Sequence, residues 1–234
     1  MKKPQFEKGY FYHIYNRGVE KRTIFGDNFD YFRFIHDLYE FNDSAPAGKF
    51  SVKRSSEVQP PKIRSKKVRD ILVKIHCFCL MPNHYHLLLE QVRDGGIIQF
   101  MKKIGTGYSM YFNEKYDRVG PLFQGRFKAI FIEEESYLTH LSRYIHLNPA
   151  ELIESHWKET GIKNWQRTNR FLDSYRWSSY PDYIGKNNFP SVITKEFISA
   201  LITSNTRNQP QSYKEFTQEW LAKDIYKISD IILE

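Results

Sequence analysis

Cysteine is scarce in this sequence, which contains only Cys77 and Cys79 among its 234 residues. Two cysteines are too few for a disulfide framework, so we expect a chain that folds under reducing conditions. Long hydrophobic runs are also missing, because no apolar stretch approaches the roughly 20 residues that a membrane-spanning helix needs. The first residues hold two lysines but neither an apolar core nor a small-residue cleavage site. We therefore expect a cytoplasmic protein that has no membrane partner. No internal repeat is visible.

Positive charge is in excess, and it is unevenly distributed. The formal net charge of +8 favours a polyanionic partner, but only weakly, because many basic proteins bind nothing. Eight basic residues lie between Lys49 and Arg69, where Glu57 is the one acidic residue and a Pro-Pro pair interrupts the chain. Large apolar residues are rare there. This composition predicts a flexible basic loop, about residues 44–69, inserted between two core elements; a solvated loop without a partner is the alternative.

Hydrophobic periodicity divides the rest of the chain into strands and helices. Alternating aromatic and β-branched residues predict strands at 10–18, 70–80, 84–90 and 123–133, and apolar residues at helical spacing predict helices at 28–41, 97–116 and 133–148. The order β-α-β-β-α-β-α favours an α+β fold of the ferredoxin-like (RRM-like) kind, an antiparallel sheet with helices on its faces. We expect a core over residues 1–150 and a mainly helical C-terminal extension over residues 151–234.

Two histidines in the segment MPNHYHLLLE (81–90) are the first candidates for chemistry. Side chains alternate across a strand, so His84 and His86 face one side while Tyr85, Leu87 and Leu89 face the other. The apolar set can be buried, which leaves the histidine face as the functional candidate. Two imidazoles at i and i+2 are close enough to share a divalent metal. Cys77 and Cys79 would complete a zinc site if the hairpin brought them near; buried cysteines that act as small hydrophobes are the alternative.

The helix predicted at 133–148 supplies a second group of candidates. Leu138, Leu141 and Ile145 form its core-facing stripe, and Tyr144 and Asn148 lie one turn apart on a flank that we expect to be half-buried. An amide oxygen is a good ligand for Mg²⁺ or Mn²⁺, and the tyrosine supplies a hydroxyl next to it. Ordinary packing of the tyrosine and a helix-terminal role for the asparagine before a proline explain the same spacing.

Four motifs occur in an order that resembles a known family. MPNHYHLLLE, YSMYFNEKY, GPLFQGRFKAIFI and YLTHLSRYIHLNPAEL are similar to motifs of the single-tyrosine transposases of the HUH endonuclease superfamily, in the branch of the REP-associated tyrosine transposases. The resemblance spans about residues 9–150, and RWSSYPDYIG (176–185) also looks like this branch. It implies that His84, His86 and Asn148 bind Mg²⁺ or Mn²⁺ and that Tyr144 is the nucleophile.

The resemblance implies an enzyme that cleaves and rejoins single-stranded DNA through a 5′-phosphotyrosine intermediate, in DNA transposition or in the processing of REP-type elements. The expected partner is single-stranded or hairpin DNA, and the chain is a monomer or a homodimer. Basic side chains would hold the DNA backbone: Arg126, Lys128, Lys62, Arg64, Lys66 and Lys67. Two alternatives remain at this point, a nucleic-acid-binding module without catalysis and a metal-dependent nuclease that uses water.

Overall fold

The computed structural model describes residues 4–46, 69–204 and 212–223. The elements of the core follow the predicted order, and their bounds are β1 (Phe11–Arg17), η1 (Val19–Lys21), α1 (Asn28–Glu40), β2 (Val73–Met81), β3 (His84–Gln91), α2 (Gly96–Lys115), β4 (Lys128–Ile132) and α3 (Glu135–Leu147). The basic residues Lys62, Arg64, Lys66 and Lys67, and nearly all of the loop expected at 44–69, lie outside the described residues.

The described strands form one four-stranded antiparallel sheet in the order β2-β3-β1-β4. The connections β1-α1-β2 and β3-α2-β4 each skip one strand, which is the ferredoxin-like arrangement, so the predicted α+β fold class is confirmed. Strands β2 and β3 form a hairpin, because Met81 pairs with His84 and only Pro82 and Asn83 lie between them. Proline has no N–H for a strand ladder, and asparagine favours turns.

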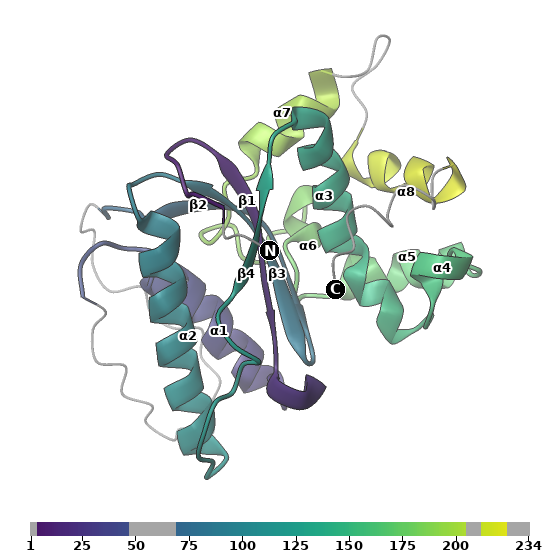
Figure 1. Cartoon of the computed structure of the whole chain (residues 1–234). Coiled ribbons are helices and arrows are strands. Elements are labelled where there is room, and N and C mark those ends of the chain that lie inside the picture. Colours follow the sequence, from purple (N-terminus) through teal and green to yellow (C-terminus); the bar gives the residue numbers. More distant parts are fainter. Residues whose placement is uncertain (1–3, 47–68, 205–211, 224–234) are drawn as a thin grey trace.

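Helices cover both faces of the sheet (Figure 1). Helices α1 and α2 lie on one side, and α3 lies on the other side with the C-terminal helices. On the α1 side, Tyr85 is buried and its ring lies 5.0 Å from that of Phe34. Gly107 allows α2 to approach the end of α1 closely, because a Cβ at this position would lie 2.5 Å from the ring of Phe41. This close approach accounts for a glycine inside a helix, where it otherwise costs stability.

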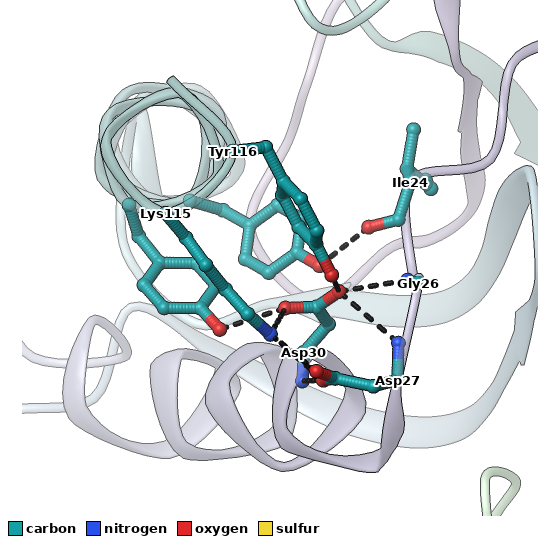
Figure 2. Close-up of polar contacts among 8 residues, drawn as sticks. Ile24, Gly26, Asp27, Asp30, Lys115 and Tyr116 are labelled. Atoms are coloured by element: carbon teal, nitrogen blue, oxygen red, sulfur yellow. Dashed lines mark hydrogen bonds and ion pairs between the residues drawn. The ribbon is translucent and has the colours of Figure 1, made fainter. Parts of the chain in front are cut away.

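A buried carboxylate joins α1 to α2 (Figure 2). Asp30 is fully buried and accepts hydrogen bonds from the backbone N–H of Gly26, the hydroxyls of Tyr111 and Tyr116, and the ammonium of Lys115, at 2.6–2.7 Å. Lys115 also reaches Asp27, the residue that caps the N-terminus of α1. Both oxygens of Asp30 are therefore hydrogen-bonded, and Lys115 balances its charge at Oδ1, as a buried carboxylate requires.

The chain after α3 is mainly helical, as predicted, and its described elements are η2 (Asn148–Leu152), α4 (Trp157–Thr160), α5 (Trp165–Ser174), α6 (Tyr180–Tyr183), α7 (Glu196–Ser204) and α8 (Tyr213–Lys223). Part of it covers the outer edge of β2. Leu80 N donates to Trp177 O at 2.9 Å, and Ser179 N donates to Phe78 O at 3.0 Å. The boundary expected at residue 150 falls within η2 and stays a prediction.

Strand β4 begins at Lys128, five residues later than expected. The segment before it bonds to the end of β1 in another way, since Gln124 N donates to Arg17 O and Asn16 Nδ2 donates to Gly125 O at 3.0 Å. Arg126 therefore lies in a loop, whereas Lys128 starts the strand. Within the described residues, the structure contains no helix that is long and apolar enough to cross a membrane.

Candidate functional site

His84 and His86 share the sheet face that packs towards α3, as the strand alternation predicted. Their ring centroids lie 5.1 Å apart, and the side chains are 6% and 0% exposed. Both side chains are therefore buried, so each ring depends on protein neighbours for its hydrogen bonds.

A third histidine, from β1, contacts this pair. Strand β1 lies beside β3 and places Tyr15 opposite His86 and Arg17 opposite His84. His13, two residues before Tyr15, is on the same face, and its Nε2 lies 2.9 Å from His86 Nδ1. The two rings stack at 5.1 Å between centroids. The sequence analysis did not select His13, although the alternation of β1 places it on this face.

Tyr144, on α3, contacts two of these histidines. Its ring meets those of His86 and His13 edge to face, at centroid distances of 5.7 Å and 6.2 Å. The expectation that Tyr144 is half-buried is wrong, because it is 1% exposed. Residues beyond the helix cover it, and the ammonium of Lys158 in α4 lies 5.2 Å from the centre of its ring. The periodicity of α3 alone carries no information on this cover.

Asn148 follows at the end of α3 and is fully buried. Its side-chain nitrogen donates to the carbonyl of Tyr144 at 2.8 Å, which fixes the orientation of the amide. Its Oδ1 is also buried and accepts no hydrogen bond from any residue that the structure describes. A buried carbonyl oxygen without a donor costs free energy, and a cation is one partner that removes this cost. The oxygen therefore fits the role of a metal ligand that the resemblance implies.

The cysteines do not fit a zinc site. Both are fully buried, and Cys77 Sγ contacts the hydroxyl of Tyr183 at 3.6 Å. Burial raises the pKa of the Cys77 thiol to about 12 and that of the Cys79 thiol further, whereas zinc binds the thiolate. The described residues contain no group of three or more His, Cys, Asp or Glu side chains arranged to hold a metal. Cys77 and Cys79 thus fit the alternative, small residues of the core.

A cavity of about 150 Å³ opens beside His84, and basic residues line it. Its lining includes Arg17 from β1, Arg126 from the loop before β4, and Lys128. Tyr15 also contributes, and its ring lies 5.5 Å from the ammonium of Lys128. The structure therefore brings two of the predicted DNA-binding residues to the same cavity as one predicted metal ligand. Arg17 and Tyr15 were not selected from the sequence.

The opposite side of α3 is held by a buried histidine. His146 Nδ1 lies 2.6 Å from the hydroxyl of Tyr213 in α8, and its Nε2 lies 2.7 Å from Ser179 Oγ. Burial lowers the pKa of His146 to about 3, so the ring is neutral in the folded protein. The helix that carries Tyr144 is thereby fixed to the C-terminal region.

Comparisons with known proteins agree with the motifs over part of the chain. The family model described as "Transposase IS200 like" matches residues 52–148. This range is less than half of the chain and contains His84, His86, Tyr144 and Asn148, and within it the match confirms the resemblance to a transposase family. Among curated proteins, none matches the sequence. One similar solved structure is a REP-associated tyrosine transposase bound to a REP hairpin, with a TM-score of 0.47 and 12% identity over 83% of this chain and 90% of that one.

Proposed function

We propose that this protein is a DNA transposase or single-strand endonuclease that cuts and rejoins single-stranded DNA through a covalent bond to Tyr144. The observation that carries the proposal is the position of the Tyr144 ring, edge-on to His86 and His13 on the histidine face of the sheet. The family match over residues 52–148 supports the reaction class.

In the proposed reaction, the phenolic oxygen of Tyr144 attacks a phosphorus of the DNA backbone. A bond forms between that phosphorus and the tyrosine oxygen, and the bond from phosphorus to the 3′-oxygen breaks. The phenolic proton ends on the released 3′-hydroxyl, and the 5′-phosphate stays on Tyr144. Attack by a 3′-hydroxyl reverses the sequence and restores the tyrosine. No bond energy is lost to water, so a new DNA end can be joined.

His84, His86 and Asn148 are the residues that we propose to hold a divalent cation. Two imidazoles and an amide oxygen suit Mn²⁺, and Mg²⁺ accepts the oxygen more readily than the nitrogens. When bound, the cation would act as a Lewis acid on the non-bridging phosphate oxygens. Lys158 adds a positive charge beside the Tyr144 ring, which favours the developing phenolate.

The cavity beside His84 is the proposed entry for the DNA backbone. Arg17, Arg126 and Lys128 put three cationic side chains around it, and a phosphate is the group that such a lining attracts. Tyr15 offers an aromatic face on which a base can stack. Hairpin DNA is a partner of this kind, because its loop presents unpaired nucleotides.

The test is the capture of a covalent adduct. The full chain is incubated with end-labelled single-stranded and hairpin oligonucleotides from the DNA that flanks its gene, with Mn²⁺ present, and is then run on a denaturing gel. We expect wild-type protein to give an adduct that mass spectrometry identifies as phosphotyrosine at position 144. Tyr144→Phe should bind Mn²⁺ and DNA but give neither cleavage nor adduct. Tyr137→Phe, two turns earlier in α3, is the matched control and should react normally.

Other results would support the alternatives. Cleavage by Tyr144→Phe without an adduct would indicate a nuclease that uses water. Tight DNA binding by the wild type without cleavage, in Mn²⁺ and in Mg²⁺, would indicate a binding module.

A further inference from the structure

The two histidines of β3 share a feature that the alternation of the strand does not explain, namely that each has its Nδ1 atom engaged. His84 Nδ1 lies 2.5 Å from Asn83 Oδ1, and His86 Nδ1 lies 2.9 Å from His13 Nε2. If Nδ1 is occupied in this way, Nε2 is the only nitrogen through which either ring can bind a cation.

For His84 the hydrogen bond fixes the tautomer. Asn83 Nδ2 donates to the carbonyl of Lys21 at 3.3 Å, so Asn83 Oδ1 is the atom that faces His84. An amide oxygen can only accept, and the proton of a neutral His84 must therefore sit on Nδ1. Its Nε2 then carries the lone pair that a metal needs.

For His86 the partner is another imidazole, which can donate or accept. We propose that His13 is a positioning residue that accepts the Nδ1 proton of His86 through its own Nε2. His13 and Asn83 then act alike, since each holds one β3 histidine in the Nδ1–H tautomer with Nε2 directed to the cation. This inference rests on the metal site of the proposed function.

The surroundings of His13 suit this role. It lies on the strand between β3 and β4, so the pairing with both neighbours sets its distance from His86. The residue is 3% exposed, and its ring stacks on that of Tyr15 at 5.1 Å. His13 Nε2 is engaged with His86 Nδ1, so this nitrogen is not available for the cation that His86 Nε2 would bind. The contact suits a residue that orients a metal-bound imidazole through the nitrogen that does not bind the metal, and such partners are common.

The first test needs no metal and no DNA. The full chain is labelled with ¹⁵N, and the ring nitrogens are observed by long-range ¹H–¹⁵N correlation at about pH 8, above the ordinary pKa of histidine. We expect His84 and His86 to show the Nδ1–H tautomer, although a histidine in water prefers Nε2–H. A wild-type His86 with its proton on Nε2 would overturn the proposal, whatever the variants do.

The second test uses two replacements of His13. Phenylalanine keeps a flat ring but has no acceptor, whereas glutamine keeps an acceptor oxygen. We expect His13→Phe to lose the Nδ1–H preference of His86 and to bind Mn²⁺ about 10–100-fold more weakly, with His84 unchanged. His13→Gln should retain most of the Nδ1–H preference of His86 and most of the Mn²⁺ affinity. Mn²⁺ affinity is measured by calorimetry, and thermal unfolding shows whether each variant is folded. Asn83→Ala should give the corresponding loss at His84.

The outcomes separate this proposal from the proposed function. Wild-type Mn²⁺ affinity in a folded His13→Phe variant would overturn the positioning role and leave the metal site intact. Nδ1–H tautomers in a protein without Mn²⁺ affinity would support the hydrogen bonds and overturn the metal site itself. If His13→Phe does not fold, the positioning role is still tested by the tautomer of His86 in the wild type and by the tautomer and Mn²⁺ affinity of His13→Gln.

Discussion

Replacing Asp30 by asparagine tests how the buried carboxylate holds α1 and α2 together. Oδ1 of Asp30 accepts from Tyr111 and Lys115, and Oδ2 accepts from Tyr116 and from the backbone N–H of Gly26. An asparagine has one acceptor oxygen and one NH₂ group. Whichever way the amide is turned, the NH₂ faces at least two donors, so the replacement removes charge and creates opposed N–H groups (Figure 2).

The expected cost follows from burial. Removing one partner of a buried ion pair costs about 3–5 kcal/mol, and Lys115 is 26% exposed, so water compensates part of its charge. We therefore expect a loss of about 3 kcal/mol in the free energy of unfolding, which lowers Tm by about 6–12 °C in a domain of this size.

Asp27→Asn is the matched control. This carboxylate contacts the same lysine but is 53% exposed, and asparagine caps a helix as well as aspartate does. Its expected effect is below about 1 kcal/mol. Both variants are compared by calorimetry and by urea unfolding at pH 7. Equal Tm values for the two variants would refute the reasoning, because exposure would then not govern the cost.

Three further predictions concern α3 and the cavity. Burial lowers the pKa of His146 to about 3, whereas its pKa in the unfolded chain is about 6.5, so the unfolded chain takes up the proton first as the pH falls. The contribution of neutral His146 to the free energy of unfolding is therefore complete above about pH 6.5. It falls by up to about 1.4 kcal/mol per pH unit towards pH 3. Urea titrations of the wild type should thus show a loss of about 2 kcal/mol between pH 7 and pH 5 that His146→Gln lacks; parallel curves would contradict it. Replacing Arg126 and Lys128 by glutamine should reduce the salt dependence of single-strand binding by about 1.4 in slope, which fluorescence anisotropy measures. Lys158→Met should slow adduct formation about 10-fold with unchanged Mn²⁺ affinity, and an unchanged rate would show that this charge does not act on Tyr144.

Much of the core was predictable because its signals are local. Alternation located the strands, and the Pro82-Asn83 turn indicated the hairpin that brings β2 against β3. The predicted start of β4 was wrong, because Gly125 and its neighbours form hydrogen bonds with β1 that hydrophobic alternation does not reveal. Helices α4 and α6 are single turns, too short to show a period.

The arrangement of the candidate site was predictable only where one element carries two of its residues. His84 and His86 share a strand, and Tyr144 and Asn148 are one helical turn apart, so spacing alone pairs them. His13 belongs to another strand, and its contact with His86 depends on which strand β1 joins. Lys158 approaches Tyr144 only because the chain folds back over α3, and the spacing of residues in the sequence does not predict this tertiary contact.

The strand order also determines when during synthesis the site can form. Strand β1 is made first, yet both of its neighbours come from residues 84–91 and 128–132. Pairings between such distant segments have high contact order and form slowly. His13 can meet His86 only after β3 has been made, and Tyr144 arrives later still. A nascent chain that ends before α3 therefore lacks Tyr144, the proposed nucleophile, and the proposed reaction with DNA would begin only when synthesis of the core is complete.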